Sequence, residues 1–371
     1  MTNGKKTSSD QISWWRTSFG DKEVDTLRES VLAEHISQGP VTAEFESRFA
    51  EFLDVPYAMA TTSGSVALFL ALMALGIGPG DEVIVPDRTW VSTAHAALLL
   101  GAKVVLVDVL SDVPVMDVDQ IRSKITPRTR AIMPVHLNGR SVDMAEINSI
   151  AQENDLFVVE DAAQAFLSKN SLGFLGTQSD AGCFSLSVAK LISTGQGGLV
   201  VTSSQKVYEK LKSIGNNGVV DNFTDTWNEM GFNFKYTDLL ASFGLAQLSR
   251  VPERLAHVND VYSKYRAGLS DYEFSFVRLL PVSQESGEVP IYVEIMCDDR
   301  DGVMQYLDDR GIQTRPATPS LHTSDYMKAE GEFPNSARFS EQSLILPCGP
   351  EQPLENIDTV LTALNEFGKT L

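Results

Sequence analysis

The feature that most constrains the fold is a repeated alternation of short apolar runs and helical patterns between residues 57 and 202. Strand-like runs separated by helices predict a mostly parallel sheet that is covered on both faces. Seven strands are predicted at residues 57–61, 82–86, 103–108, 131–136, 156–160, 182–185 and 198–202. The helices predicted between them lie at residues 66–75, 91–100, 118–124 and 144–153. The chain is therefore expected to be an α/β protein whose large domain contains a seven-stranded sheet flanked by helices.

The length of 371 residues and the change of pattern after the sheet region predict two domains. Residues 1–12 are expected to form a disordered tail, residues 13–250 the large domain, and residues 251–371 a smaller α+β domain. Further helices are expected at residues 23–33, 41–52, 237–247, 252–269, 299–310 and 354–367. Two more strands are expected at residues 291–296 and 345–347, and loops at residues 215–227 and 311–319.

Charge and cysteine content exclude several classes of function. The formal net charge of −19 argues against nucleic acid or an anionic membrane as a partner. The three cysteines are dispersed and fit a reduced, cytoplasmic chain with neither a disulfide framework nor metal-ligand spacing. The longest apolar stretches are too short to span a bilayer, and the polar first ten residues do not resemble a signal peptide. Any phosphate site must therefore be local and built largely from backbone N–H groups.

A single lysine, Lys190, follows the apolar run that is predicted as the strand at residues 182–185. Burial of an ammonium group is costly, and desolvation lowers its pKa, so that the neutral amine can attack an aldehyde and form a Schiff base. The alternative is a lysine whose amine reaches the surface from the end of the strand, and this is the more common arrangement.

Three other polar segments also follow predicted strands. Ser63, Gly64 and Ser65 open a predicted helix and offer N–H groups and hydroxyls to a phosphate, although Ser63 can equally be a simple N-cap. Asp161 can hold a pyridinium nitrogen protonated, and Gln164 can bind a cofactor hydroxyl; the alternative for both is a helix N-cap and capping box.

The aromatic residue Trp90 also follows a predicted strand, and it can either stack on a cofactor ring or be an ordinary core tryptophan. An acid, a lysine and a phosphate cradle at separate strand ends are typical of a pyridoxal 5′-phosphate (PLP) site.

The chain resembles the DegT–DnrJ–StrS family of PLP-dependent sugar aminotransferases, which have the aspartate aminotransferase fold (fold type I). The resemblance runs from residue 19 to residue 364 and rests on several ordered matches, which are far more specific together than any one alone. These matches are residues 37–40, 63–68, 76–86, 134–139, 160–165, 231–235, 244–248 and 319–322.

The resemblance implies a role for each candidate. Lys190 resembles the lysine that binds PLP covalently and moves protons, Asp161 the partner of the pyridinium, and Gln164 the residue near the cofactor hydroxyl. The phosphate cradle would consist of Gly64, Ser65 and Ser185, and the stacking aromatic would be Trp90. Asn233 resembles the residue that reaches the phosphate from the neighbouring subunit of a homodimer.

Two departures from the family pattern put the substrate in doubt. Ser187 stands where the family often has an aromatic residue or histidine, and Gln196 where it often has glutamate. Members that dehydrate sugars have histidine in place of the lysine, so the presence of Lys190 favours transamination. The predicted reaction moves an amino group from glutamate to a nucleotide-linked keto-deoxy sugar. The alternatives are an aminotransferase for a cyclitol or another non-nucleotide carbonyl compound, and a regulatory homologue without activity.

Three residues are candidates for contacts with the substrate. Arg315 and Lys235 can contact a diphosphate, although each is equally well explained as a solvated surface cation. His322 lies in the family match at residues 319–322, in a loop that is expected to face the cleft.

Overall fold

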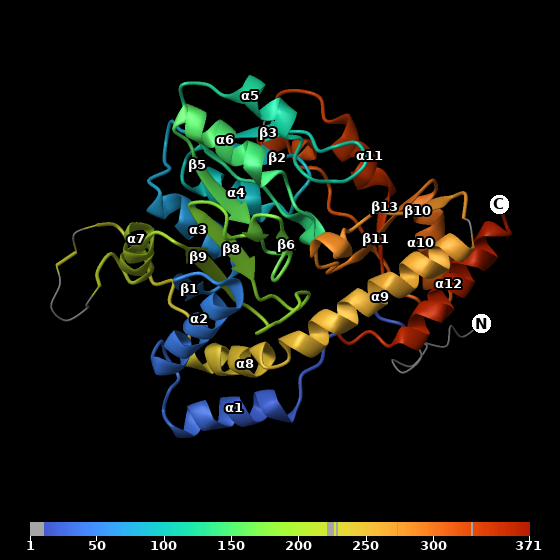
Figure 1. Ribbon diagram of the computed structural model, residues 1–371, viewed down its shortest axis with the longest axis horizontal. Helices are drawn as coiled ribbons and strands as arrows, with labels where there is room; N and C mark the ends of the chain where they lie inside the picture. Colours follow the sequence, from blue (N-terminus) through green and yellow to red (C-terminus); the bar gives the residue numbers. More distant parts are fainter. Residues whose placement is uncertain (1–10, 221–225, 228, 273, 328) are drawn as a thin grey trace.

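The structure is a computed structural model, and it describes residues 11–220, 226–227, 229–272, 274–327 and 329–371. Most of the tail expected at residues 1–12 lies outside the described residues, as does the middle of the loop expected at residues 215–227. The chain forms a large helix-flanked sheet and, beside it, a smaller unit that contains the C-terminus (Figure 1).

The predicted seven-stranded sheet is present, with the strand order β1-β9-β8-β5-β4-β2-β3. All neighbouring strands are parallel except that β9 runs antiparallel to both β1 and β8. Because no helix separates β8 from β9, the chain returns by a loop, and that loop contains Lys190. The strands are β1 (Tyr57–Thr61), β2 (Glu82–Pro86), β3 (Lys103–Val107), β4 (Thr129–Ile132), β5 (Phe157–Asp161), β8 (Ala181–Ser185) and β9 (Gly198–Thr202).

Helices cover both faces of this sheet (Figure 1). Successive side chains in a strand point to opposite faces, so neighbouring residues of one strand pack in different cores. Val83 and Val85 pack in a core that includes α3 and α4, whereas Ile84 packs in a core that includes α6. Phe45 and Phe49 of α2 are fully buried, as their spacing predicts. The flanking helices are α2 (Pro40–Leu53), α3 (Gly64–Ala74), α4 (Ser92–Leu99), α5 (Ile121–Lys124), α6 (Met144–Asn154), α7 (Gln205–Gly215) and α8 (Asp238–Leu248).

A second, antiparallel sheet with the order β10-β11-β13-β12 forms the core of the smaller unit. The long helix α9 (Val251–Asp271) runs from beside α8 to this sheet (Figure 1). We propose that the boundary between the two domains falls where α9 begins, after residue 250. The other elements are β10 (Val277–Leu279), β11 (Val293–Cys297), α10 (Arg300–Asp308), β12 (Arg315–Pro316), α11 (Pro334–Gln342), β13 (Ser343–Leu346) and α12 (Leu354–Gly368).

Several elements differ from the sequence-based expectation. The strand predicted at residues 131–136 ends as β4 at Ile132, shortly before Pro134, which has no N–H to donate to a ladder. The loop predicted at residues 311–319 contains the two-residue strand β12, which is ordered by its pairing with β13. Five further elements were not predicted: α7, α11, β10 and the two strands of a hairpin, β6 (Lys169–Asn170) and β7 (Gly173–Phe174).

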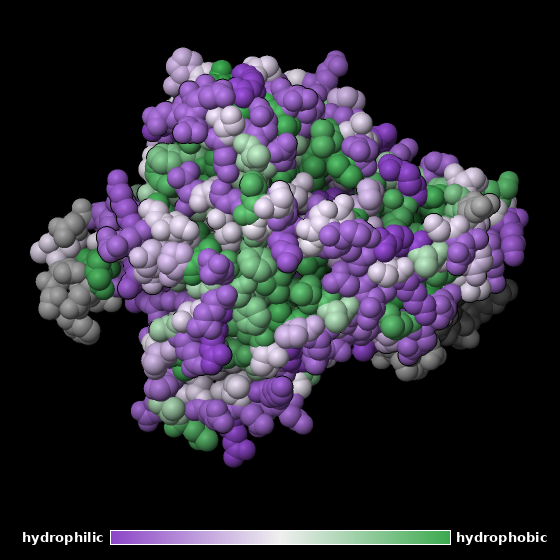
Figure 2. Space-filling view, in the orientation of Figure 1, coloured by the Kyte–Doolittle hydropathy of each residue, from purple (hydrophilic) through white to green (hydrophobic). Residues whose placement is uncertain are grey.

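The first helix, α1 (Asp21–Leu32), packs against α8 with a different face from the one that its apolar spacing indicates. Val24, Val31 and Leu32 are 62%, 51% and 73% exposed, whereas Glu23 and Ser30 are buried. The residues that the structure describes therefore leave an apolar stripe of α1 exposed. On the face drawn in Figure 2, hydrophilic side chains dominate the surface around a central hydrophobic area.

Candidate active site

A cavity of about 370 Å³ lies where residues at the carboxyl ends of the large sheet's strands meet residues of the smaller sheet. This volume is within the range of ordinary small-molecule sites. Eight of the residues selected from the sequence line the cavity: Gly64, Ser65, Trp90, Asp161, Gln164, Ser185, Lys190 and Arg315. A second hollow of about 10 Å³ behind Lys190 is apolar and too small for a cofactor.

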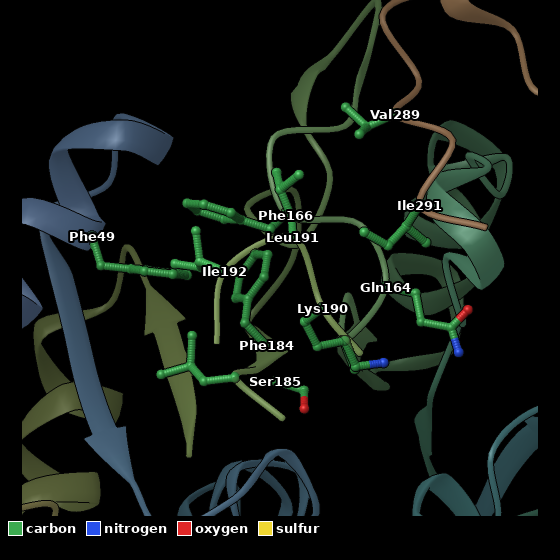
Figure 3. Close-up of a pocket in the computed structure, with 12 residues that line it drawn as sticks. Phe49, Gln164, Phe166, Phe184, Ser185, Lys190, Leu191, Ile192, Val289 and Ile291 are labelled. Carbon is green, nitrogen blue, oxygen red and sulfur yellow. The ribbon is translucent and has the colours of Figure 1, made fainter. Parts of the chain in front are cut away.

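Lys190 lies in the β8–β9 loop, five residues beyond the last residue of β8, rather than directly at the end of the strand. Its amine lies 3.5 Å from the hydroxyl of Tyr292, which donates a hydrogen bond of 2.7 Å to the Ala189 carbonyl. In Figure 3 the amine is turned towards the side of Gln164 and away from the apolar side chains of Phe49 and Ile192.

The environment of Lys190 makes its amine easier to deprotonate than that of an ordinary lysine. Burial lowers the Lys190 pKa to about 8, against the opposing charge of Asp161 and with a smaller contribution from the Arg315 charge. About one tenth of the amine is then unprotonated at pH 7, far more than for an ordinary lysine, and this neutral form can act as a nucleophile. The alternative of an amine that extends into solvent is wrong, because the side chain is directed into the cavity.

Asp161 is the last residue of β5 and is 5% exposed. Its Oδ2 accepts a hydrogen bond of 2.7 Å from the Thr93 hydroxyl, and its Oδ1 one of 3.1 Å from the Ala163 N–H. Burial raises the pKa of Asp161, although these hydrogen bonds and the charge of Lys190 oppose the shift. A buried carboxylate of this kind is stabilised by a cationic partner such as a pyridinium nitrogen. Turns rather than a helix follow Asp161, so the N-cap alternative is wrong.

The N-terminus of α3 lies against the end of β8. Ser63 is the N-cap and accepts a hydrogen bond from the Val66 N–H, while Gly64 and Ser65 line the cavity. A Cβ atom on Gly64 would lie 2.9 Å from the Ser185 Cβ, so the close approach of the two elements requires glycine. Serine hydroxyls and the first N–H groups of a helix therefore gather at one end of the cavity, which fits a phosphate group.

Two other predicted cofactor contacts also lie in the cavity wall. Trp90 is 50% exposed and lines the cavity, so the alternative of a core tryptophan is wrong. Gln164 accepts a hydrogen bond of 2.8 Å from the Asn138 N–H through its Oε1, which leaves its amide NH₂ group for a ligand. The absence of a helix after Asp161 also excludes the capping-box alternative for Gln164.

Three selected residues do not line this cavity. Asn233 is exposed, and Lys235 lines a separate hollow beside α2 and α7. The Nδ1 atom of His322 lies 2.7 Å from Asp87 Oδ2, and its ring stacks on Phe333. The structure thus gives no support to the expected substrate contact from His322, because its side chain links the segment after β12 to the end of β2.

Five residues of the cavity region escaped the sequence analysis: Trp14, Arg88, Thr93, Tyr292 and Glu294. Four of them line the cavity, and Thr93 binds Asp161 from behind it. The signal that was available for Glu294 was a single charge inside an apolar run, and for Arg88 a charge shortly after one, as for Lys190. The other three are ordinary residue types for their positions, and only the folded chain brings them to the site.

Two kinds of feature are absent from the part of the chain that the structure describes. None of the helices there is both long enough and apolar enough to cross a membrane. Within the same residues, no group of three or more histidine, cysteine or acidic side chains is arranged to hold a metal ion.

The fold and the site define a PLP-dependent aminotransferase. The sequence model of one protein family matches nearly the whole chain, from residue 18 to residue 365. The chain belongs to the DegT/DnrJ/EryC1/StrS aminotransferase family.

Individual proteins of known name support this membership. The chain is 32% identical over 361 residues to the GDP-perosamine synthase of Escherichia coli O157:H7, covering 96% of this chain and 98% of that protein. The structure of DesV from S. venezuelae in complex with a ketimine intermediate is 30% identical, with a TM-score of 0.89 and coverage of 94% of each chain. The structure of DesI in the presence of its TDP-sugar product is 27% identical, with a TM-score of 0.89 and coverage of 97% of this chain and 93% of that one.

Proposed function

We propose that this enzyme transfers an amino group from glutamate to a nucleotide-linked keto-deoxy sugar. The observation that carries the proposal is the convergence of Lys190, Asp161 and the Gly64–Ser185 contact on one cavity. The names of two similar proteins, a GDP-perosamine synthase and a sugar aminotransferase crystallised with its TDP-sugar product, support the class of acceptor.

Each residue of the cavity has a role in the proposal. When bound, PLP supplies an electron sink for the bond that breaks at the carbon bearing the amino group. Lys190 would hold the cofactor covalently, and its amine would be the base that takes a proton from that carbon of the donor and the acid that gives one to the product. Asp161 holds the proton on the ring nitrogen through a charged hydrogen bond. Gly64, Ser65 and Ser185 bind the phosphate.

Two further residues would help to hold the cofactor. Trp90 would pack against its ring, and the amide of Gln164 would bind its hydroxyl. These two side chains lie on different elements, Trp90 between β2 and α4 and Gln164 after β5, so that together they set the orientation of the ring.

Arg315 is the proposed contact for the diphosphate of the acceptor. Its guanidinium group lies over the ring of Trp14, 5.0 Å from the centroid, and the residue is exposed at the cavity. Stacking uses the face of the guanidinium group and leaves its N–H edges for phosphate oxygens. Arg315→Ala is expected to raise the KM for the nucleotide sugar more than the KM for glutamate.

The proposal includes a homodimer in which Asn233 and Lys235 of each subunit complete the site of the other. Both residues lie outside the cavity of their own subunit. Exposed large apolar side chains on α1, together with Met230 and Phe232 at 80% and 67% exposure, offer a surface for a second copy.

A cytoplasmic location also belongs to the proposal, since the three cysteines are free and buried.

Single-turnover measurements test the function. The PLP form of the enzyme is mixed with L-glutamate, and the loss of the visible absorbance band is followed. The resulting pyridoxamine phosphate form is then mixed with guanosine- or thymidine-diphosphate-linked keto-deoxyhexoses, with cyclitol ketones or with simple keto-acids. Return of the band with a nucleotide sugar supports the proposal. Return only with cyclitol ketones or keto-acids overturns it.

A further inference from the structure

Arg88 is a buried cation in the wall of the active-site cavity. It follows β2 at the carboxyl end of the large sheet, is 2% exposed, and lines the same cavity as Lys190 and Asp161. Glu294 of β11 faces it across the boundary between the two sheets, and the carboxylate of Glu294 accepts a hydrogen bond from Arg88 Nη2. Arg88, Glu294 and Arg140 form an ion cluster in which two cations share one acid.

The two arginines of this cluster differ in how completely they are satisfied. All three nitrogens of Arg140 are hydrogen-bonded: Nε to the Pro281 carbonyl at 2.8 Å, Nη1 to Glu294 Oε2 at 3.0 Å, and Nη2 to the Leu280 carbonyl at 3.4 Å. Arg88 uses only Nη2, and its Nε and Nη1 atoms have no hydrogen-bond partner within the described residues. A buried N–H group without an acceptor is destabilising, so this arrangement is unfavourable in the free chain.

The missing partner must be a hydrogen-bond acceptor, because a guanidinium group carries only donors. The cluster has two positive charges and one negative charge, so that one positive charge is uncompensated at the cavity wall. A carboxylate satisfies both requirements, since it neutralises the charge and accepts a hydrogen bond from an unpaired N–H group. A sugar hydroxyl can accept a hydrogen bond but leaves the charge uncompensated.

We infer that Arg88 binds a carboxylate of the amino-acid donor. The inference rests on the proposed function, because that reaction brings a carboxylate into this cavity in its first half and an uncharged sugar ring in its second half. Glu294 and Arg140 hold Arg88 in place from the side of the smaller sheet. Arg88 then distinguishes the two substrates that use the same cavity in turn.

The test compares Arg88→Met and Arg88→Lys with the wild-type holoenzyme in separate half-reactions. Loss of a charge-assisted hydrogen bond is expected to weaken glutamate binding in Arg88→Met by roughly 10- to 100-fold. Arg88→Lys keeps the charge but loses the planar guanidinium group, so its affinity for glutamate is expected to lie between those of the wild type and Arg88→Met. The second half-reaction with a nucleotide-linked keto-deoxyhexose is expected to change less than threefold.

Glutarate supplies a readout that does not depend on turnover, because it has the carboxylates of glutamate but no amino group. Its affinity for the holoenzyme, measured by calorimetry, is expected to fall in parallel with that of glutamate. The matched control is Arg140→Met. It removes the other arginine that pairs with Glu294 but leaves Arg88, the proposed contact for the carboxylate, in place. It is expected to lower the thermal unfolding midpoint while keeping glutarate affinity closer to wild type than Arg88→Met does.

Three outcomes overturn the inference: wild-type glutarate affinity in Arg88→Met, equal weakening of the donor and sugar half-reactions, or an equal loss of glutarate affinity in Arg140→Met. Failure of the wild-type enzyme to react with glutamate is a different result. It contradicts the proposed donor, whereas binding of glutarate still decides the role of Arg88.

Discussion

Asp161 and Lys190 owe their chemistry to the residues that surround them in space. The Thr93 hydroxyl lies 2.7 Å from Asp161 Oδ2, 2.9 Å from the Thr89 hydroxyl and 3.0 Å from the Trp90 carbonyl. A hydroxyl has a single proton to donate, and the carboxylate is the strongest acceptor of the three. Thr93 therefore fixes the orientation of Asp161 and is a positioning residue for the site.

Thr93→Val is expected to lower kcat/KM and cofactor affinity by roughly 10-fold each, because Asp161 loses a hydrogen bond that favours its charged form. Thr93→Ser keeps the hydroxyl and is expected to restore most of both. Steady-state kinetics and equilibrium dialysis of PLP measure the two quantities. A valine variant with wild-type cofactor affinity and kcat/KM would show that the hydroxyl does not matter.

The sequence identified Lys190 and Asp161, which carry unusual chemistry for their positions, and it missed Thr93 and Tyr292, which act through them. Lys190 and Asp161 follow apolar runs where charges are rare, so each was visible alone. Thr93 in α4 and Tyr292 before β11 are common residues for such segments, and their contacts join positions 68 and 102 residues apart in the chain. No local pattern encodes such pairs.

Among the elements, α2 is linked to the edge strand β1 by a half-buried acid, Glu46. Glu46 Oε1 accepts a hydrogen bond of 2.7 Å from the Ala60 N–H. Burial raises the pKa of Glu46 to about 7, although this hydrogen bond and the charge of Lys212 oppose the shift. The folded state thus binds a proton more tightly than the unfolded state, and stability falls as the pH rises from about 4.5 to 7.

Glu46→Gln removes this titration and is expected to keep the contact with Ala60. Relative to wild type, the variant is expected to gain roughly 1–3 kcal/mol of unfolding free energy between pH 4.5 and pH 8. Urea unfolding at the two pH values measures the difference. The same stability difference at both values would contradict the raised pKa.

The strands of the large sheet were predicted well because each is a short apolar run with clear boundaries. Both β1 and β2 begin and end at the predicted residues. The elements that were missed depend on tertiary contacts or lack an apolar signal. β12 is a two-residue strand that contains a proline and pairs only with β13, and α11 is largely polar along its length.

At the scale of the whole molecule, the apolar spacing of α1 predicted a buried face, but the single chain leaves that face exposed. The proposed cover for this face is a second copy of the chain. The proposed dimer also accounts for the position of Asn233, which was selected as a cofactor contact but lies outside the cavity of its own subunit.

Mixed dimers test this arrangement. Lys190→Ala and Asn233→Ala subunits are each expected to be nearly inactive alone. Random mixing gives half hybrid dimers, and one of the two sites in each hybrid is intact, so about one quarter of wild-type activity is expected to return. Subunits co-expressed with different tags and assayed together provide the measurement. A fully active monomer in sedimentation, or mixtures that stay inactive, would contradict a shared site.

The central claim is that Lys190 holds the cofactor in the cavity between the two sheets. The most direct measurement is borohydride reduction of the holoenzyme, followed by proteolysis and mass spectrometry of the peptides. Reduction converts a Schiff base to a stable secondary amine, so the pyridoxyl group is expected on the peptide that contains Lys190 and on no other. Lys190→Ala is expected to yield no labelled peptide. A pyridoxyl group on any other lysine of the wild-type chain would contradict the account.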